Sequence, residues 1–359
     1  MSVMEQPLVA SVAREIDIVG APAMPVPPQA ILMQAGLGYI VSACLNVVVK
    51  LGIPDLLGTG TQSVEVLAQQ SGAKAEYLFR ILRVLEAHGM FHRRRRSFSL
   101  SPAGLLLQTG VPGSMAAMAE WIADPLHLSL YSELRGTVET GTTTFEAMHG
   151  EPFFQWASQP ENAEEAEVFN QAMVGLSEMC GPAFLEAYDF GCFEKIIDVG
   201  GGHGGLVRTI LKAHPQVSGV VAEMASVVPG ACVAIAGDGL ESRCEAVECN
   251  FFAAVPEGGD CYLLKHILHD WSDESALQIL RQIRKVIPET GTLILAESVL
   301  DDSAAPSPGK LIDIEMMTFV GGKERTEDEF RELLARAGFL LGRVLPTKTP
   351  LMLLEAFPA

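Results

Sequence analysis

A short apolar run that ends in a carboxylate and a cluster of glycines constrains this chain more than any other stretch. Residues 195–205 read KIIDVGGGHGG. The apolar residues predict a strand buried on both faces of a parallel sheet, and the glycines let the backbone approach a bound molecule closely. Residues 206–213 continue with a helical pattern. Strand, glycine turn and helix together are typical of a nucleotide-cofactor site in an open α/β sheet.

The C-terminal half alternates strand-like and helix-like segments from Phe193 onward. This alternation predicts a doubly wound parallel sheet, and the last two apolar segments predict a hairpin at its edge. The strands are expected at 195–199, 219–223, 245–251, 260–265 and 292–297, with the hairpin at 340–345 and 351–357.

The N-terminal third has a different pattern. Helical segments at 31–51, 63–70 and 74–88 are followed by an alternating segment at 91–100 that carries four consecutive arginines. Two short helices and a hairpin are typical of a winged-helix module, which often binds DNA. The alternative is a dimerisation module whose arginines are solvated, and the acidic charge of the chain favours this alternative.

Composition restricts the partners and the location. The 359 residues include 44 acidic and 25 basic side chains, a formal net charge of −19, which opposes nucleic-acid binding and favours a small molecule. Seven scattered cysteines without a Cys-x-x-Cys pair indicate a reducing cytoplasm and no zinc site. The best apolar run, 39–49, has about half the length that a bilayer requires and contains Asn46, so we expect no membrane span.

These patterns divide the chain into four expected parts. Five prolines and little periodicity indicate a flexible arm over 1–28. A winged-helix-like dimerisation module follows over 29–110, a helical linker and substrate lid over 111–190, and a cofactor-binding catalytic domain over 191–359.

The glycine turn distinguishes between adenosine cofactors. A dinucleotide site would read Gly-x-Gly-x-x-Gly, whereas here Asp198 directly precedes the turn. Its carboxylate repels a pyrophosphate but attracts a cationic amino-acid group. S-adenosylmethionine, which carries an ammonium and a sulfonium, therefore suits this turn better than NAD. Glu223, at the end of the next strand, is expected to accept the ribose hydroxyls of either cofactor.

A second polar constellation is expected at the same sheet edge. The segment 263–274 reads LLKHILHDWSDE, which puts His266 and His269 just beyond the carboxyl end of a strand. Glu297 ends the following strand, and Glu324 precedes a helix. Two histidines and two carboxylates at one edge indicate acid–base chemistry, although a lone histidine is more often structural.

Four motifs in this order resemble one enzyme family. Residues 198–204 (DVGGGHG), 264–274 (LKHILHDWSDE), 296–298 (AES) and 321–326 (GGKERT) are similar to those of the small-molecule O-methyltransferases. These are metal-independent, S-adenosylmethionine-dependent enzymes of plant phenolic pathways, such as the caffeate-type enzymes, and of bacterial polyketide pathways, such as the hydroxyneurate and anthracycline types. The resemblance implies an α/β fold, a Rossmann-like doubly wound methyltransferase sheet with an N-terminal all-α winged-helix dimerisation domain. It also implies a homodimer and a small aromatic hydroxylated substrate.

Carried over residue by residue, the resemblance assigns the catalytic base to His269 and the two flanking acids to Glu297 and Glu324. Two cofactor positions depart from the family, which has Asp where this chain has Glu223 and Asn250. The expected cofactor contacts are Asp198, Gly200, Gly202, Glu223, Asn250, Phe251 and Lys265.

The same resemblance implies that the pocket for the methyl acceptor lies among the helices above the sheet. Methionine and aromatic side chains suit a flat ring, although the same residues are common in an ordinary core. The candidates are Trp121, Phe169, Met173, Met316, Met317 and Phe319.

The expected mechanism is proton removal from a phenolic hydroxyl by His269, with Glu297 or Glu324 hydrogen-bonded to the other ring nitrogen. His266 is an alternative base, and Asp270 and Asp273 are alternative magnesium ligands. Other readings keep the fold and cofactor but change the reaction to N-methylation, hydroxylation, decarboxylation or pericyclic chemistry. A winged-helix regulator that senses a metabolite is a third possibility.

Overall fold

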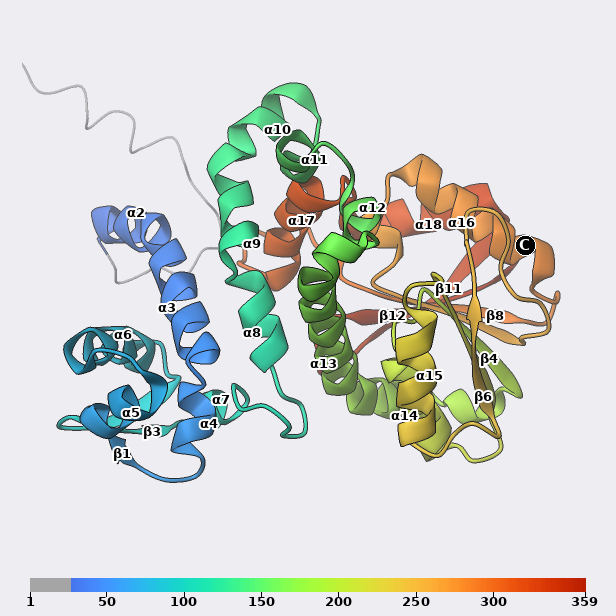
Figure 1. Cartoon of the computed structure of the whole chain (residues 1–359). Helices are drawn as coiled ribbons and strands as arrows, with labels where there is room; N and C mark the ends of the chain where they lie inside the picture. The colour runs from blue at the N-terminus through green and yellow to red at the C-terminus, as the bar shows by residue number, and fades with distance from the viewer. Residues whose placement is uncertain (1–26) are drawn as a thin grey trace, which may run out of the picture.

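The computed structural model describes residues 27–359. The arm expected at 1–28 therefore lies outside the described residues, except for its last two positions. The described chain consists of an N-terminal helical module, a group of helices in the middle of the sequence and a C-terminal α/β unit, arranged side by side (Figure 1).

The N-terminal module contains the expected helices and hairpin, and a short further strand makes a three-stranded sheet. Ser63 is the N-cap of the helix Val64–Ser71, because its hydroxyl accepts a hydrogen bond from the backbone N–H of Val66. The module has its own apolar core, which includes Val48, Leu82 and Phe98. Its elements are α2 (Pro28–Gly36), α3 (Gly38–Lys50), α4 (Ile53–Leu57), β1 (Gln62–Ser63), α5 (Val64–Ser71), α6 (Ala75–Ala87), β2 (Phe91–Arg94) and β3 (Ser97–Leu100).

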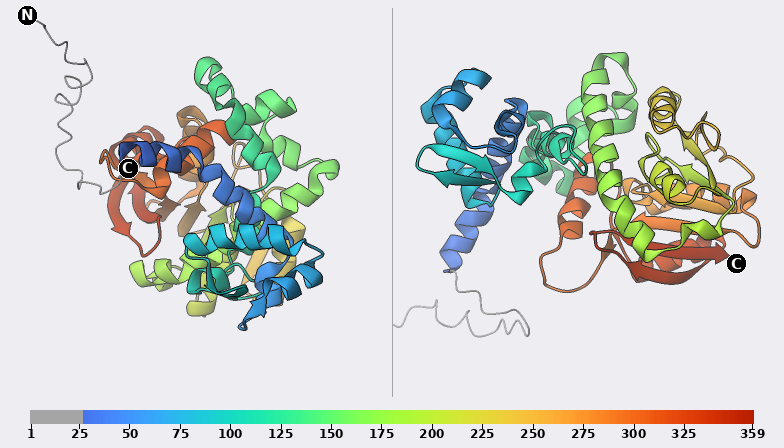
Figure 2. Two further views of the ribbon diagram at one scale, coloured as in Figure 1. Left: turned by 90° about the vertical axis from the view of Figure 1, so that its left-hand side faces the viewer. Right: turned by 90° about the horizontal axis from the view of Figure 1, so that it is seen from below.

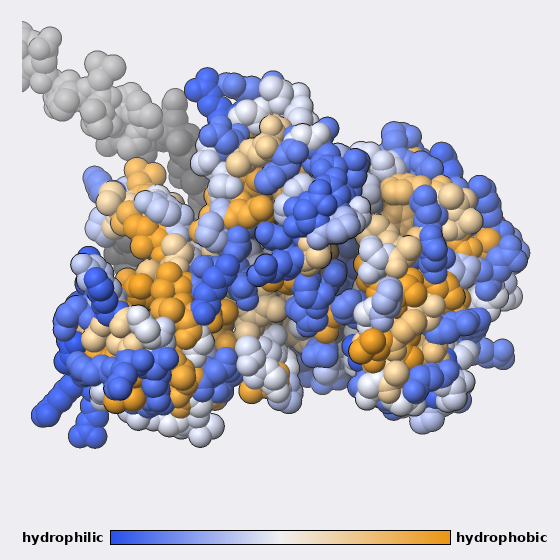
Figure 3. Space-filling model, in the orientation of Figure 1, coloured by the Kyte–Doolittle hydropathy of each residue, from blue (hydrophilic) through white to orange (hydrophobic). Residues whose placement is uncertain are grey.

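Helices α2 and α3 expose a long apolar surface. Leu32 and Tyr39 are 75% and 65% exposed, and apolar side chains gather over these helices in Figure 3. The stretch Pro28–Lys50 is 23 residues long and apolar enough to cross a membrane, longer than the run expected from the sequence. A helix that a second subunit covers has the same composition, so length and hydropathy alone do not identify a span.

The middle helices connect the two ends of the molecule. Helix α13 packs against both α8 and α14, so that it links the helical group to the sheet (Figures 1 and 2). Its contact with α14 is close, because a Cβ atom at Gly205 would lie 2.8 Å from Ser177 Cβ, and one at Gly181 would lie 2.8 Å from Thr209 Cγ2. The helices are α7 (Pro102–Leu105), α8 (Ala116–Ile122), α9 (Pro125–Leu130), α10 (Leu134–Thr140), α11 (Thr144–His149), α12 (Phe153–Ala157) and α13 (Ala163–Ala187).

A seven-stranded mixed sheet forms the C-terminal unit and confirms the doubly wound prediction. The strand order is β11-β12-β8-β7-β4-β5-β6; β11 with β12 and β12 with β8 are antiparallel pairs, and the other pairs are parallel. The chain runs outward from β4 through β5 to β6 and then returns to β7, so the topological switch point lies between β4 and β7. The strands are β4 (Lys195–Val199), β5 (Ser218–Glu223), β6 (Cys244–Glu248), β7 (Cys261–Lys265), β8 (Thr292–Glu297), β11 (Phe339–Pro346) and β12 (Met352–Pro358).

Helices cover both faces of this sheet, and two of them begin where the sequence indicates. Ser272 caps α16, and Thr326 and Glu329 form a reciprocal capping box at the start of α18. One strand is shorter than expected: the segment 245–251 leaves the sheet after Glu248, so Asn250 and Phe251 lie in the following turn. The helices are α14 (Gly205–Ala213), α15 (Val228–Gly237), α16 (Asp273–Val286), α17 (Pro308–Phe319) and α18 (Glu327–Ala337).

Candidate active site

The candidate site lies at the carboxyl ends of the central strands, beside the switch point. The glycine turn follows β4, and the segment with both histidines follows β7, its neighbour in the sheet. A small parallel pair, β9 (Val299–Leu300) with β10 (Arg325–Thr326), brings the segment 321–326 to the end of β8. The topology therefore joins four sequence motifs at one edge of the sheet.

The glycine turn is tightly packed. Gly200 and Gly202 have φ angles of +71° and +59°, which side chains rarely adopt. A Cβ atom at Gly200 would lie 2.5 Å from Ile267 Cδ1, and one at Gly201 would lie 2.5 Å from Asp198 Oδ2. Glycine is therefore required both by the backbone conformation and by the space beside the buried carboxylate.

Asp198 is a buried carboxylate with one unsatisfied oxygen. It is 1% exposed, and its Oδ2 has no hydrogen-bond partner among the described residues. Burial raises the pKa of Asp198 to about 7, against the opposing charge of Lys265. A positively charged ligand group would satisfy this oxygen and favour the ionised form. The residues present thus fit a cofactor with a cationic amino-acid end.

Glu223 and the turn after β6 lie on the other side of the glycine turn. Glu223 Oε1 accepts a hydrogen bond of 3.1 Å from the backbone N–H of Gly202, so its carboxylate is tied to that turn. Burial raises the pKa of Glu223. Asn250 Oδ1 accepts a hydrogen bond of 3.1 Å from the backbone N–H of Phe252, which closes the turn that carries Phe251.

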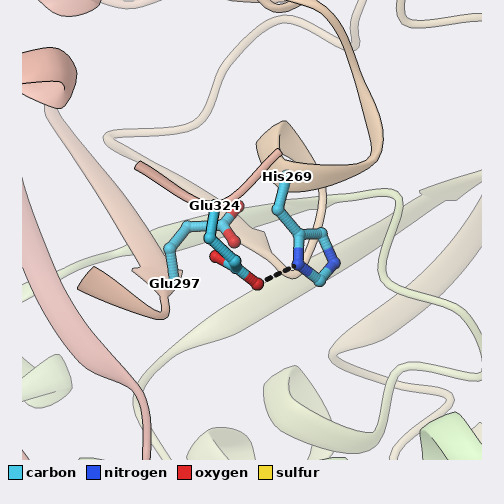
Figure 4. A group of neighbouring side chains, drawn as sticks. All are labelled: His269, Glu297 and Glu324. Atoms are coloured by element: carbon cyan, nitrogen blue, oxygen red, sulfur yellow. Dashed lines mark hydrogen bonds and ion pairs between the residues drawn. The ribbon is translucent and has the colours of Figure 1, made fainter. Parts of the chain in front are cut away.

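The ring of His269 contacts two carboxylates, those of Glu324 and Asp270, and Figure 4 shows the contact with Glu324. Its Nδ1 is 2.8 Å from Glu324 Oε1, and its Nε2 is 3.4 Å from Asp270 Oδ1. Burial disfavours the imidazolium, but the carboxylates of Asp270, Glu297 and Glu324 overcome it and raise the pKa of His269 to about 10. The ring is therefore oriented through Nδ1, and its surroundings favour the protonated imidazolium.

The two expected acids make different contacts. Glu297 does not bond to the ring; its Oε1 accepts hydrogen bonds of 3.1 Å and 2.9 Å from the backbone N–H groups of Ile267 and Leu268. Burial raises the pKa of Glu297, and the charge of His269 opposes this shift. The sequence left open which glutamate orients the imidazole, and in the structure Glu324 does so while Glu297 holds the backbone before it.

The same three residues have the composition of a metal site. One ligand atom from each of His269, Glu297 and Glu324 lies within 4.8 Å of the others, close enough for a divalent ion. Asp273 is not part of this group, because its carboxylate is paired with Arg325 at 2.9 Å and Lys323 at 3.2 Å. The absence of a metal requirement stays a prediction from the sequence.

His266, the alternative base, stacks on the ring of His269 with centroids 4.7 Å apart. Burial and the neighbouring charges of His269 and Lys265 lower the pKa of His266 well below its ordinary value. Its φ angle of +54° is unusual for a residue with a side chain. A ring with so low a pKa is a poor proton acceptor, which favours His269. Lys265 itself is half-buried, and burial lowers its pKa.

Most of the expected acceptor residues belong to one aromatic cluster between α8, α13 and α17. The ring of Trp121 lies 5.2 Å from that of Phe169 and 5.4 Å from that of Phe319, and Met173 packs against the same cluster. Met316 and Met317 lie on α17 but are not members of this cluster.

Three further residues contribute contacts at the site: Asp270, which the sequence suggested only as an alternative magnesium ligand, and Asp313 and Arg325, to which the sequence assigned no role. Asp270 contacts the ring of His269, and Asp313 Oδ1 accepts a hydrogen bond of 2.9 Å from the backbone N–H of Glu324. Arg325 is fully buried beside them. The position of Asp270 next to His269 in the sequence could have indicated a contact with the base. No sequence feature indicates the contacts of Asp313 and Arg325, because these depend on how distant segments pack.

Two family models and several known proteins are similar to this chain. The O-methyltransferase domain family matches residues 131–340, and the O-methyltransferase dimerisation domain family matches residues 33–110. The chain is similar to a phenazine O-methyltransferase, PhzM, of Lysobacter antibioticus, at 37% identity over 93% of this chain and 97% of the relative. It is also similar to an 8-amino-8-demethylriboflavin N,N-dimethyltransferase of Streptomyces davaonensis, at 35% identity over 86% of this chain and 89% of the relative.

A solved structure extends this similarity. The neocarzinostatin biosynthesis O-methyltransferase NcsB1, in complex with S-adenosyl-L-homocysteine and 1,4-dihydroxy-2-naphthoic acid, superposes with a TM-score of 0.73 at 27% identity. The match covers 94% of this chain and 100% of that one.

The environment of His269 leads to a prediction for Glu324→Gln. Removing this negative charge should lower the pKa of His269 from about 10 toward the ordinary value for histidine. NMR titration of ¹³C-labelled histidine measures the midpoint, and His269→Gln assigns the resonance. Glu315→Gln is the control, because Glu315 faces His127 at 3.3 Å instead. Equal midpoints in the two variants would contradict the assignment.

Proposed function

This chain belongs to the O-methyltransferase family and is an S-adenosylmethionine-dependent enzyme, and on that premise we propose that it methylates a phenolic or other acidic hydroxyl of a small aromatic secondary metabolite. The observation that carries the proposal is the hydrogen bond between Nδ1 of His269 and Glu324. His269 follows β7, the strand that pairs with the strand before the glycine turn. We assign the general base to His269 and its support to Glu297 and Glu324.

We assign cofactor binding to the residues around the glycine turn. When bound, S-adenosylmethionine supplies a methyl group on a positively charged sulfur. The unsatisfied Oδ2 of Asp198 would accept a hydrogen bond from the cationic end of the ligand. Gly202 would leave room beside it, because a Cβ atom there would meet no described atom within 4 Å. Glu223 would accept the ribose hydroxyls. Lys265, Asn250 and Phe251 are the remaining proposed contacts.

His269 must be neutral to accept the proton of the substrate. Its carboxylate neighbours favour the imidazolium in the free protein, whereas a cation held at the adjacent strand end disfavours it and lowers the pKa of the ring. We therefore infer that cofactor binding prepares the base. Once Nε2 has taken the hydroxyl proton, Glu324 stabilises the imidazolium through Nδ1, and alignment of the two reactants supplies most of the remaining acceleration.

The acceptor would lie against the aromatic cluster of Trp121, Phe169, Met173 and Phe319, with Met316 and Met317 contributed by α17. Phenazine, in the name of one relative, and a naphthoic acid, in the NcsB1 complex, are aromatic molecules of suitable shape. A nitrogen acceptor is the second candidate, because a relative with 35% identity is an N,N-dimethyltransferase. The presence of His269, Glu297 and Glu324 favours methyl transfer to oxygen over hydroxylation, decarboxylation or pericyclic chemistry.

We further propose a homodimer that forms through the module over 29–110, with a lid over 111–190 and the cofactor domain over 191–359. The match to a dimerisation domain and the exposed apolar face of α2 and α3 support this arrangement. A cytoplasmic location agrees with seven cysteines that form no disulfide.

The central test compares His269→Ala with Glu223→Ala. His269→Ala should lower turnover about 100-fold or more, since a positioned base contributes 10²–10⁴-fold, while the cofactor dissociation constant stays near wild type. Glu223→Ala should instead weaken cofactor binding, which calorimetry measures as a larger dissociation constant. Turnover is followed as transfer of a labelled methyl group to a panel of hydroxylated aromatics, including 1,4-dihydroxy-2-naphthoic acid and an aromatic amine. Wild-type turnover in His269→Ala would refute the base assignment, and EDTA should leave the rate unchanged.

Proton release on binding tests the coupling between cofactor and base. At about pH 8 the free enzyme should carry the His269 proton, and S-adenosylmethionine should expel it because the sulfonium lowers the pKa of the ring. S-adenosylhomocysteine lacks that charge and should release fewer protons. Calorimetry in two buffers of different ionisation enthalpy measures the difference, which His269→Ala should abolish. Equal release by both ligands would show that the base is not coupled to the cofactor charge.

The dimer proposal is tested with two equally exposed positions. Leu32 on α2 and Val233 on α15 are each 75% exposed. Leu32→Glu should convert the protein to monomers at micromolar concentration, because it puts a charge into the proposed apolar interface. Val233→Glu, on the other side of the molecule, should leave the dimer intact. Light scattering measures the mass, and a monomeric wild type would contradict the proposal.

A further inference from the structure

Arg325 is the largest fully buried side chain among the described residues. A buried guanidinium is costly unless all its donors are paired. Only one of its partners is a carboxylate, that of Asp273, whose side chain is 41% exposed. Its other partners are backbone carbonyl groups. A partner set of this kind points to a role in holding backbone rather than in charge neutralisation alone.

Besides a longer contact of 3.4 Å to the carbonyl of Lys323, Arg325 contacts two carbonyl groups that lie on either side of His269. Its Nη1 donates a hydrogen bond of 2.7 Å to the carbonyl of Leu268, and its Nη2 donates one of 2.8 Å to the carbonyl of Trp271. Its Nε donates to Asp273 Oδ1 at 2.9 Å. The guanidinium thus spans the segment 268–273, which contains the base.

The residues around Arg325 complete the attachment. Glu324, its neighbour in sequence, bonds to the ring of His269, so one dipeptide contacts both the side chain and the backbone of the base segment. Gly322 lies so close to this segment that a Cβ atom there would overlap the carbonyl oxygen of His269. Pairing of Arg325 in β10 with Val299 in β9 anchors the dipeptide to the segment that directly follows β8.

We propose that Arg325 is a positioning residue, which holds the backbone on either side of His269 so that the imidazole stays against Glu324. The inference rests on the proposed function of His269 as the base. Arginine is required because its planar fork presents several donors in fixed directions, whereas a lysine ammonium is a point charge that cannot reach both carbonyl groups and Asp273 together.

The test compares Arg325→Lys with Arg243→Lys. Arg243 is a matched control, since its guanidinium also donates to backbone carbonyl groups, those of Val217 at 2.7 Å and Leu211 at 2.9 Å, remote from the candidate site. Hydrogen–deuterium exchange of the peptide 266–272 is the first readout and needs no acceptor. Turnover and its pH dependence, with the aromatic panel used for His269→Ala, are the second.

Arg325→Lys should accelerate exchange in 266–272 but not in 195–205, and should leave the cofactor dissociation constant within about twofold of wild type. Turnover should fall about 100-fold, the cost of misplacing a catalytic group by about 1 Å. The acidic limb of the pH profile for kcat/KM should move to lower pH by about one unit, because the pKa of His269 falls when the ring leaves Glu324. Arg243→Lys should change none of these quantities.

A merely structural role would lower the amount of folded enzyme at every pH without moving the limb, and that result would overturn the proposal. So would wild-type exchange and turnover in Arg325→Lys. If this variant does not fold, Asp273→Ala, which removes one partner at the surface, should produce the same changes to a smaller extent, and their absence would count against the proposal. A wild type that methylates no acceptor refutes the proposed function instead, while the exchange measurement still decides whether Arg325 holds the segment.

Discussion

Burial of negative charge at one edge of the sheet is the constraint on which the rest of this site depends. Asp198, Glu297 and Glu324 are each at most 2% exposed, and Asp270 lies beside them. Buried carboxylates are stable only when hydrogen bonds or cations compensate them. Backbone N–H groups bond to Oε1 of Glu297, and His269 bonds to Oε1 of Glu324. Among the described residues, the second oxygen of each glutamate and Oδ2 of Asp198 have no hydrogen-bond partner. The free protein thus keeps buried carboxylate oxygens without partners at the edge where a cationic ligand is expected, and such a ligand would favour their ionised forms, which gives a physical reason for a cationic cofactor.

Local sequence fixes the ends of the segments that carry these charges. Ser272 starts α16 directly after the segment with His269, and the capping box of Thr326 and Glu329 starts α18 directly after Glu324. A capped helix has a defined first turn, so the residues before it have a defined exit direction. The two polar segments therefore approach each other from rigid elements, and the contacts between them need little further ordering.

Much of this could be predicted because it depends on local signals. The strand that ends at Glu297 has the expected bounds, and the glycine turn, the helix caps and the sheet topology also follow from short patterns. Contacts between distant segments could not be predicted. Nothing in the sequence tells which glutamate reaches the imidazole, or that Arg325, within a polar motif, is buried under the base segment. The strand β6 ends before Asn250, earlier than the apolar alternation suggests, and the side chain of Asn250 instead accepts a hydrogen bond from the backbone N–H of Phe252 in a turn. Residue type alone likewise does not distinguish a substrate contact of Trp121 and Phe319 from core packing, because aromatic side chains are common in both.

Helix α13 has a consequence for how such an enzyme diverges. Small residues pack its C-terminal half directly against the helix that follows the glycine turn, while Phe169 and Met173, nearer its start, belong to the aromatic cluster. About 12 residues at 1.5 Å per residue separate Phe169 from Gly181, so one rigid element sets a spacing of about 18 Å. Sliding the helix to admit a larger molecule would disturb the cofactor side. Descendants of this protein that acquire new acceptors should therefore change side chains along the first half of α13 and retain Gly181 and Gly205.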